Sequence, residues 1–191
     1  KYKVIAEYKG VKDSVELNVV MDPRIPVPTD ALIAQREMID DLTSKIEVLY
    51  KGTQQLIESK GITDKVSAQI DGVKGDETKE LQNSVKAVKD SINAVQDNIF
   101  GKQNAETQGI TSRENNSVTG RIQSALRYIN SRPGKPTLTE EKLVKEATEL
   151  ISKAVENINR FYVNVWPEFR EKVENTEIPL FKDYDLLELN E

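Results

Sequence analysis

The side chains best suited to chemistry in this sequence are aromatic and acidic, because the chain contains no histidine and no cysteine. A histidine-dependent catalytic triad, a His-ligated zinc site and the Glu-x-x-His di-iron site of helical bundles are therefore excluded. Disulfide and thiol chemistry are excluded as well. We expect no catalytic residue, no metal site and no cofactor.

The densest group of unusual residues is the segment 161–169, which holds the only tryptophan and two of the four phenylalanines. Its rings could form a platform that binds a sugar. They could instead pack one end of a helical bundle, since aromatic side chains contribute much of the energy of protein cores. The sequence favours the packing interpretation, and the candidate binding patch consists of Phe161, Tyr162, Trp166 and Phe169.

Two acidic pairs, Asp40-Asp41 and Glu140-Glu141, are weak candidates for acid–base chemistry. Adjacent residues on a helix point about 100° apart and do not share a site. Glu140 also lies three residues after Thr137, where it would complete a capping box at a helix start. Residues 71–76 are acidic and contain glycine, but they lack the ligand spacing of an EF-hand calcium loop, so we expect a solvated turn.

Composition excludes other functions. The formal net charge is −5, and no run of Lys or Arg is present, which argues against a nucleic-acid partner or an acidic membrane surface. No apolar run approaches the length that a membrane-spanning helix requires, so we expect no membrane insertion. The length of 191 residues allows one substantial core, or one core and a small annex.

The most regular element is predicted for residues 80–100. Apolar residues follow one another there at alternating steps of four and three, with polar residues between them. This spacing places the apolar side chains on one narrow stripe of an α-helix, which other helices must cover. The stripe consists of Leu81, Val85, Val88, Ile92, Val95 and Ile99.

A first long helix is predicted to begin after Pro28, with Thr29 or Asp30 as its N-cap, and to end where Gly61 adopts the left-handed conformation. A second helical stretch then opens at Thr63 or Asp64 and breaks at residues 71–76 before the regular stripe resumes. The first helix carries its own stripe of Leu32, Ile39, Leu42, Ile46, Leu49 and Leu56, with Gln35 and Thr53 at the intervening positions.

Residues 101–113 are polar and aperiodic, which predicts a long loop. A third helix is predicted over residues 114–131, and a fourth follows from Thr137 with a kink or a new segment at Pro167. Residues 178–189 are predicted to form an extended tail on the surface.

The first 21 residues predict a β-hairpin with one apolar face, because apolar and polar residues alternate on both sides of a turn that contains Gly10 and Asp13. The second strand is expected to include Val19 and Met21. A two-stranded hairpin is marginal by itself. We therefore expect that it rests on the helices beside Trp166, that it pairs with a second copy, or that it ends a β-sandwich whose earlier strands lie upstream.

Asp22, Pro23 and Arg24 begin a joint in which three prolines alternate with other residues. Each proline fixes its own φ and favours an extended residue before it, so the joint is expected to be short and stiff. It is either a simple strand-to-helix connector, or a joint in which Asp22 and Arg24 pair with each other or with nearby backbone and fix the angle between two bodies.

Together these elements predict a mainly α fold in two units. Residues 1–28 form the hairpin and proline-rich joint, interpreted as the end of an Ig-like β-sandwich, since the chain begins at Lys1 inside a predicted strand. Residues 29–191 form an antiparallel up-down-up-down four-helix bundle with an extended C-terminal tail.

The order of these parts resembles the C-terminal region of large exported bacterial proteins with sortilin-like BNR-repeat β-propellers, often labelled glycosyl hydrolases. The residues that carry the resemblance are Tyr2, Val4, Val19, Asp22-Pro23-Arg24, Leu32, Gln35 and Pro136-Thr137. The resemblance implies a secreted, periplasmic or cell-surface location, with the rest of the parent polypeptide upstream. Any catalytic residues would lie in the propeller, so none is carried over to this chain.

The sequence thus favours a non-catalytic accessory module that serves spacing, docking or assembly in a larger secreted or surface protein. Its partners would be the upstream polypeptide and a protein or a glycan. One alternative is a carbohydrate-binding or glycoside-processing domain that uses the aromatic patch around Trp166. Another is a helical adaptor that associates with itself along an exposed stripe.

Overall fold

A computed structural model describes residues 1–24, 26–71, 73, 75–102 and 117–178 of the chain. Within these residues the fold is mainly helical and begins with an antiparallel two-stranded hairpin, as predicted. The elements are β1 (Tyr2–Tyr8), β2 (Val11–Leu17), α1 (Thr29–Ile70), α2 (Asp76–Phe100), α3 (Val118–Ile129), α4 (Leu138–Arg160), the π-helical η1 (Phe161–Val165) and α5 (Trp166–Asn175).

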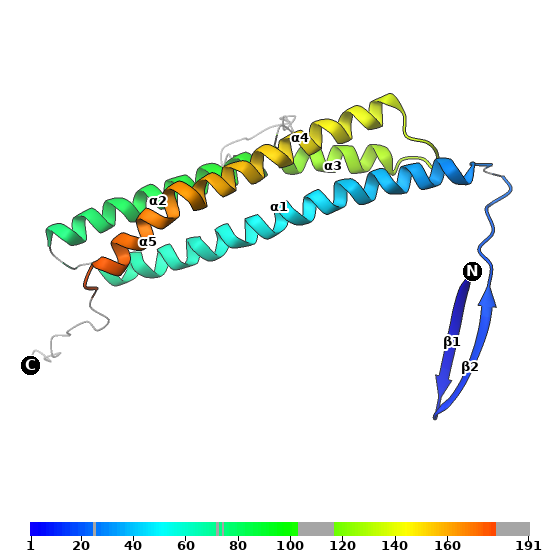
Figure 1. Cartoon of the computed structure of the whole chain (residues 1–191), viewed down its shortest axis with the longest axis horizontal. Helices are drawn as coiled ribbons and strands as arrows, with labels where there is room; N and C mark the ends of the chain where they lie inside the picture. Colours follow the sequence, from blue (N-terminus) through cyan, green and yellow to red (C-terminus); the bar gives the residue numbers. More distant parts are fainter. Residues whose placement is uncertain (25, 72, 74, 103–116, 179–191) are drawn as a thin grey trace, which may run out of the picture.

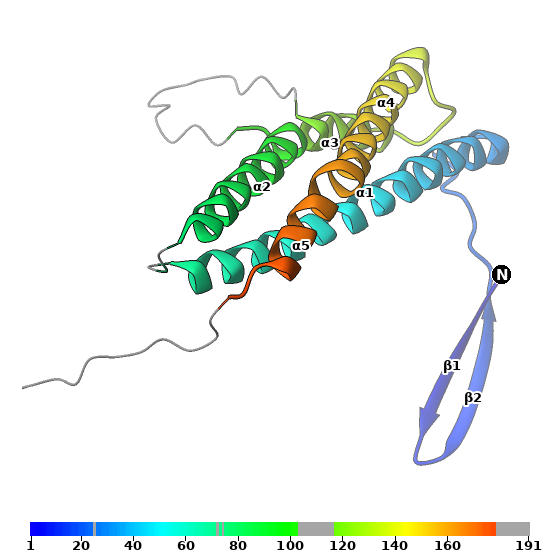
Figure 2. The ribbon, with the colours of Figure 1, turned by 60° about the vertical axis from the view of Figure 1, so that its left-hand side comes forward.

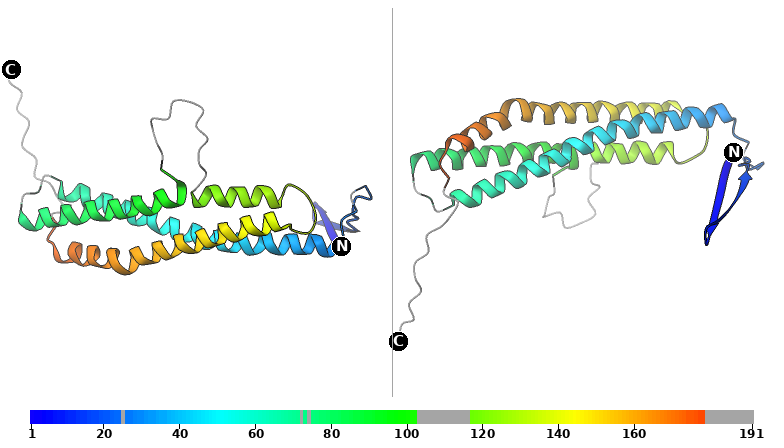
Figure 3. Two further views of the ribbon diagram at one scale, coloured as in Figure 1. Left: turned by 90° about the horizontal axis from the view of Figure 1, so that it is seen from above. Right: turned by 60° about the horizontal axis from the view of Figure 1, so that its bottom comes forward.

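The helices form an elongated rod (Figure 1). α1 runs along most of its length, α2 and α3 lie end to end beside α1, and α4, η1 and α5 return as one continuous helical path (Figures 2 and 3). The predicted up-down-up-down order is therefore wrong at one step, because α2 and α3 run in the same direction. The bundle has three rows of helix, the second of which is divided into α2 and α3.

The junction between α2 and α3 is held by direct contacts at their ends. The hydroxyl of Thr119 donates to the carbonyl of Ile99 over 3.1 Å, so the start of α3 lies against the end of α2. Ser117 is the N-cap of α3, because its side chain accepts from the amide of Gly120. The predicted loop over 101–113 and the predicted start of this helix at Glu114 fall largely outside the described residues.

The first helix is longer than the sequence predicted. α1 extends through Gly61 to Ile70, where the predicted break over residues 71–76 separates it from α2. Gly61 is helical, and a Cβ built on it meets nothing within 4 Å, so it occupies an outward position where only its low helix propensity matters. The helix begins at Thr29 with Pro28 as its N-cap, one residue before the first of the two predicted N-caps, Thr29 and Asp30.

The core lies between the three rows. All six stripe residues of α2 face it: Leu81, Val85, Val88, Ile92 and Ile99 are buried, and Val95 is half-buried against them. From α1, Leu42, Leu49, Leu56, Thr63 and Ile70 are buried at steps of seven residues. A seven-residue period is the signature of helices packed side by side at a small angle.

The end of the third row contains a π-helical turn at η1, where the amide of Trp166 donates to the carbonyl of Phe161. Pro167 follows directly. A proline in a helix has no amide to donate and crowds the carbonyl four residues before it, which in this chain belongs to Val163. The wider π turn accommodates this proline, so the predicted kink at Pro167 takes the form of a π segment rather than a break.

The hairpin turns at Lys9 and Gly10, both of which have positive φ (51° and 80°). Two consecutive positive φ values define the type I′ turn that suits a two-residue hairpin loop. Asp13 therefore lies in β2 opposite Ala6, not in the turn as predicted, and Val19 and Met21 lie beyond the end of β2. Every residue of both strands is exposed.

Two glycines of α1 provide a test of this helix. Gly61→Ala should raise the free energy of unfolding by about 0.5–1 kcal/mol, since Ala is the better helix former and nothing obstructs its methyl group. Gly52→Ala should bring no such gain, because its Cβ would lie 3.0 Å from Cδ1 of the buried Ile158. Urea unfolding followed by circular dichroism measures both. A loss of stability in Gly61→Ala would mean that α1 ends at this glycine.

Candidate functional site

Within the described part of the chain, exposed large apolar side chains gather on the hairpin. The cross-strand pairs Tyr2–Leu17, Val4–Val15 and Tyr8–Val11 share one face, which also carries the pair Ala6–Asp13. The large apolar side chains of this face are between 47% and 74% exposed. An antiparallel sheet with one apolar face ordinarily packs that face against another layer, so this surface is a candidate docking site.

The hairpin projects from the end of the rod where α1 begins, whereas Trp166 lies near the opposite end (Figure 1). The expectation that the hairpin rests beside Trp166 is therefore wrong. The chain path explains the distance: α1 begins just after the joint, and η1 and α5 come only after α4 has returned along the rod.

In the joint, Asp22 and Arg24 pair with each other, which is the second of the two interpretations that the sequence left open. The guanidinium donates to both carboxylate oxygens (Nη2 to Oδ2 over 2.7 Å, Nε to Oδ1 over 3.0 Å), and the amide of Arg24 donates to Oδ1 over 2.9 Å. These bonds lower the pKa of Asp22 and raise that of Arg24. Pro23 lies between the two in an exposed turn, so the three residues form one closed local unit.

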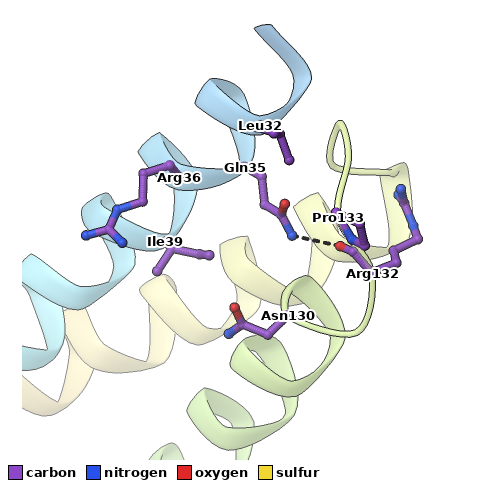
Figure 4. A pocket seen from close by; sticks show the side chains of 7 residues that line it. All are labelled: Leu32, Gln35, Arg36, Ile39, Asn130, Arg132 and Pro133. Atoms are coloured by element: carbon purple, nitrogen blue, oxygen red, sulfur yellow. Dashed lines mark hydrogen bonds between the residues drawn. The ribbon is translucent and has the colours of Figure 1, made fainter. Parts of the chain in front are cut away.

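Next to the joint, Gln35 of α1 ties three segments together (Figure 4). Its amide nitrogen donates to the carbonyl of Ile129 and, over 2.9 Å, to that of Arg132, while its amide oxygen accepts from the amide of Gly134 over 3.3 Å. Helix ends leave carbonyls without partners. Gln35 supplies partners for the end of α3 and fixes the α3–α4 turn against the start of α1.

Glu140 completes this end of the rod. It is the N3 residue of the predicted capping box, which is present: its carboxylate accepts from the amide of Thr137 over 2.6 Å. The same carboxylate accepts from Arg132 over 3.1 Å and is buried. Glu140 therefore has a structural role. Of the other acidic residues, Asp40 pairs with Arg36 and Asp41 with Lys45, each one helical turn away.

The four residues of the aromatic patch come together in the structure. Trp166 lies 6.1 Å from Phe161 and 5.6 Å from Phe169, measured between ring centroids, and the Phe161 and Tyr162 rings meet edge to face at 5.1 Å. Phe161 and Phe169 are only 3% and 2% exposed. Their faces are therefore used in packing η1 and α5 onto the core.

Tyr162 joins this patch to α1, because its hydroxyl shares a hydrogen bond with the hydroxyl of Ser59 over 2.9 Å. Partial burial raises the pKa of Tyr162; the bond to Ser59 opposes this rise and the nearby Glu58 charge adds to it. Ser59 is one of three buried polar residues of α1. The hydroxyls of the other two, Thr53 and Thr63, donate to carbonyls one turn back in the helix.

An open groove runs beside the patch between α2 and the α4–η1 path, and its largely apolar lining includes several polar residues. They include Asn98, Asn157, Asn164 and Arg160, next to Phe161. A second groove, between α1 and α2, contains the ion pair of Asp64 and Lys89 at 2.8 Å. Among the described residues, no three metal-ligating side chains come together.

No protein-family model, no curated protein and no solved structure matches this chain. The likeness to exported BNR-repeat proteins therefore rests on the residues that suggested it. In the described ranges, none of the helices combines the length and the apolar character needed to cross a membrane.

No sequence pattern predicted the contacts that Gln35 and Arg132 make at this end of the rod. The partners of Gln35 are main-chain groups far away in the sequence, whereas Arg132 bonds nearby, to the carbonyl of Lys135 and the carboxylate of Glu140. A polar residue at a seam position of a predicted helix, as Gln35 is, was the available signal. The seam position of Gln35 indicated a side chain turned toward the core, but no pattern in the sequence predicted its hydrogen-bond partners.

The partial burial of the Tyr162 hydroxyl predicts an alkaline pH dependence. Since folding raises the pKa of Tyr162, its contribution to stability is complete below the pKa of an unfolded tyrosine, about 10, and is lost as the pH rises through the higher folded value. Tyr162→Phe should lower the free energy of unfolding by about 1 kcal/mol at pH 7. This difference from the wild type should shrink above pH 10.

Urea unfolding at a series of pH values between 7 and 11 measures this dependence. Tyr50→Phe is the control, since Tyr50 is 62% exposed and its substitution should leave the profile unchanged. A wild-type profile parallel to that of Tyr162→Phe across the whole range would contradict the buried position of this hydroxyl.

Proposed function

We propose that this chain is a non-catalytic accessory module of a larger secreted or surface protein. In this module a helical rod acts as a spacer, and the hairpin at one end of the rod acts as the docking element. The observation that carries the proposal is the uncovered apolar face of the hairpin, attached to a rod that has its own separate core. Exposed apolar surfaces of this kind mark interaction sites in soluble proteins. The hairpin therefore serves docking and the helices serve spacing.

The rod has the dimensions and packing of a spacer. α1 contains 42 residues, which corresponds to about 63 Å at 1.5 Å per residue. It is supported by α2 over one half of its length and by α3 and α4 over the other (Figure 1). An isolated helix of this length would bend and fray, whereas continuous packing along one seam supports a fixed length.

The joint restricts the orientation of the hairpin relative to the rod. Pro28 has φ −59° and ψ 141°, the extended polyproline conformation, directly before α1. The bonded pair of Asp22 and Arg24 holds the other end of the joint. A segment restricted at both ends has few conformations, so the hairpin keeps a defined direction relative to α1.

A carbohydrate-binding or glycoside-processing domain is the second candidate. The groove lined by Asn98, Asn157 and Asn164 beside Phe161 favours it, because amide side chains readily hydrogen-bond to sugar hydroxyls. The aromatic patch weakens it: sugar platforms present open ring faces, and Phe161 and Phe169 are buried. The accessory role is thus better supported.

Double labelling tests the spacer role directly, and the absence of natural cysteine makes it simple. Spin labels at Lys12→Cys in β2 and Lys153→Cys in α4, both exposed, should give a narrow distance distribution by pulsed electron resonance in dilute protein. Replacing Pro23, Pro26 and Pro28 by Gly should broaden it, because glycine removes the restriction on φ. A distribution equally broad in both proteins would contradict the spacer role.

A further inference from the structure

The sequence of β1 is complementary to itself when it is read against a second copy in the antiparallel direction. If the two copies pair about a two-fold axis, opposite charges meet on the polar face and apolar side chains meet on the other. The facing residues are then Ile5 with Ile5, Lys3 with Glu7, Val4 with Ala6, and Tyr2 with Tyr8. Such an interface is isologous and closes at a dimer.

The outer edge of β1 carries backbone amides and carbonyls in the positions that this pairing with a second copy requires. Tyr8 and Val11 flank the two-residue turn and form a hydrogen-bonded pair, and bonded pairs alternate with unbonded pairs along an antiparallel ladder. The amides and carbonyls of Lys3, Ile5 and Glu7 therefore point outward. Pairing centred on Ile5 brings these same three residues of each copy into hydrogen-bonding positions.

The outer edge of β2 is protected, whereas that of β1 is not. The outward amide of Ser14 already donates to Oδ1 of Asp13 over 2.8 Å. Asp13 also places a charge on the apolar face of β2, which is a common device against edge pairing. In β1 the corresponding face positions carry no charge, and no described residue bonds to the outward amide of Ile5.

The position of Ile5 is a second observation in favour of pairing between two copies of β1. Ile5 lies on the polar face, between Lys3 and Glu7, and is 61% exposed. A large apolar residue at the centre of a charged face is unfavourable in a lone hairpin. Opposite a second Ile5, the two side chains would cover each other and be flanked by two Lys–Glu pairs.

We propose that a second copy of this chain pairs with the outer edge of β1, so that two hairpins form one four-stranded antiparallel sheet centred on Ile5. No helix lies along this edge in any of the views (Figures 1–3). The contact involves one strand of seven residues from each copy, so it belongs to the small, concentration-dependent class of interfaces. The proposal goes beyond spacing, which a monomer can perform.

Sedimentation velocity over a concentration series, from micromolar to about millimolar, tests the dimer. The wild-type mass should rise from 21.6 kDa towards twice that value. Ile5→Pro removes the central outward amide without touching a bond inside the hairpin, and it should keep the protein monomeric. Ser14→Pro is the matched control directly across the hairpin, on the β2 edge, and should leave the dimer intact.

Residue-resolved amide exchange by NMR gives a second readout that needs no variant. The amides of Lys3, Ile5 and Glu7 should gain protection as the concentration rises, and the amide of Ser14 should not. A wild-type protein that stays monomeric at every concentration would overturn the proposal. So would a dimer in which the Ile5 amide gains no protection, because that dimer would use another surface. In either case the distance measurement on the dilute monomer would still decide the spacer role.

Discussion

The structure depends on the continuous seam of α1. Leu42, Leu49, Leu56, Thr63 and Ile70 present a buried side chain at every second turn. The helix that carries them contacts two helices that follow each other, α2 and α3. Each of these shorter helices would be marginal alone. Because α1 spans both, it aligns them end to end and gives α4, η1 and α5 one surface along which to return.

The buried side of α1 is not uniformly apolar, and each of its buried polar side chains has a hydrogen-bond partner. Thr53 and Thr63 bond to their own helix, and Ser59 bonds to Tyr162. Within the described residues, no buried side-chain polar atom lacks a partner. Small side chains here, together with Gly52 against Ile158, allow the return path to approach α1 closely at the π turn. At the other end of the rod, Gln35 joins α1 to the end of α3 by hydrogen bonds to the carbonyls of Ile129 and Arg132.

The sequence predicted those parts of the fold that repeat or that follow local chemistry. The α2 stripe and the capping box at Thr137 were both predicted, because the residues involved lie close together along one helix. The Asp22–Arg24 pair was one of two interpretations of the joint. Gly61 was misread, since a glycine that ends a helix and one that merely faces solvent look alike in sequence. Thr63 interrupts the apolar spacing of α1 because it is a polar residue. It can be buried because its hydroxyl donates to the carbonyl of Ser59 in the same helix. The parallel direction of α2 and α3 depends on contacts between helices, which the spacing of apolar residues in the sequence does not reveal.

The helical rod should fold without the hairpin, since the two meet only through the joint. Deleting residues 1–21 and comparing thermal unfolding with that of the full chain tests this independence. The midpoint of the helical signal and the emission spectrum of Trp166, the first residue of α5, should both stay unchanged. A lower midpoint, or a shifted tryptophan spectrum, would show instead that the hairpin packs on the helices.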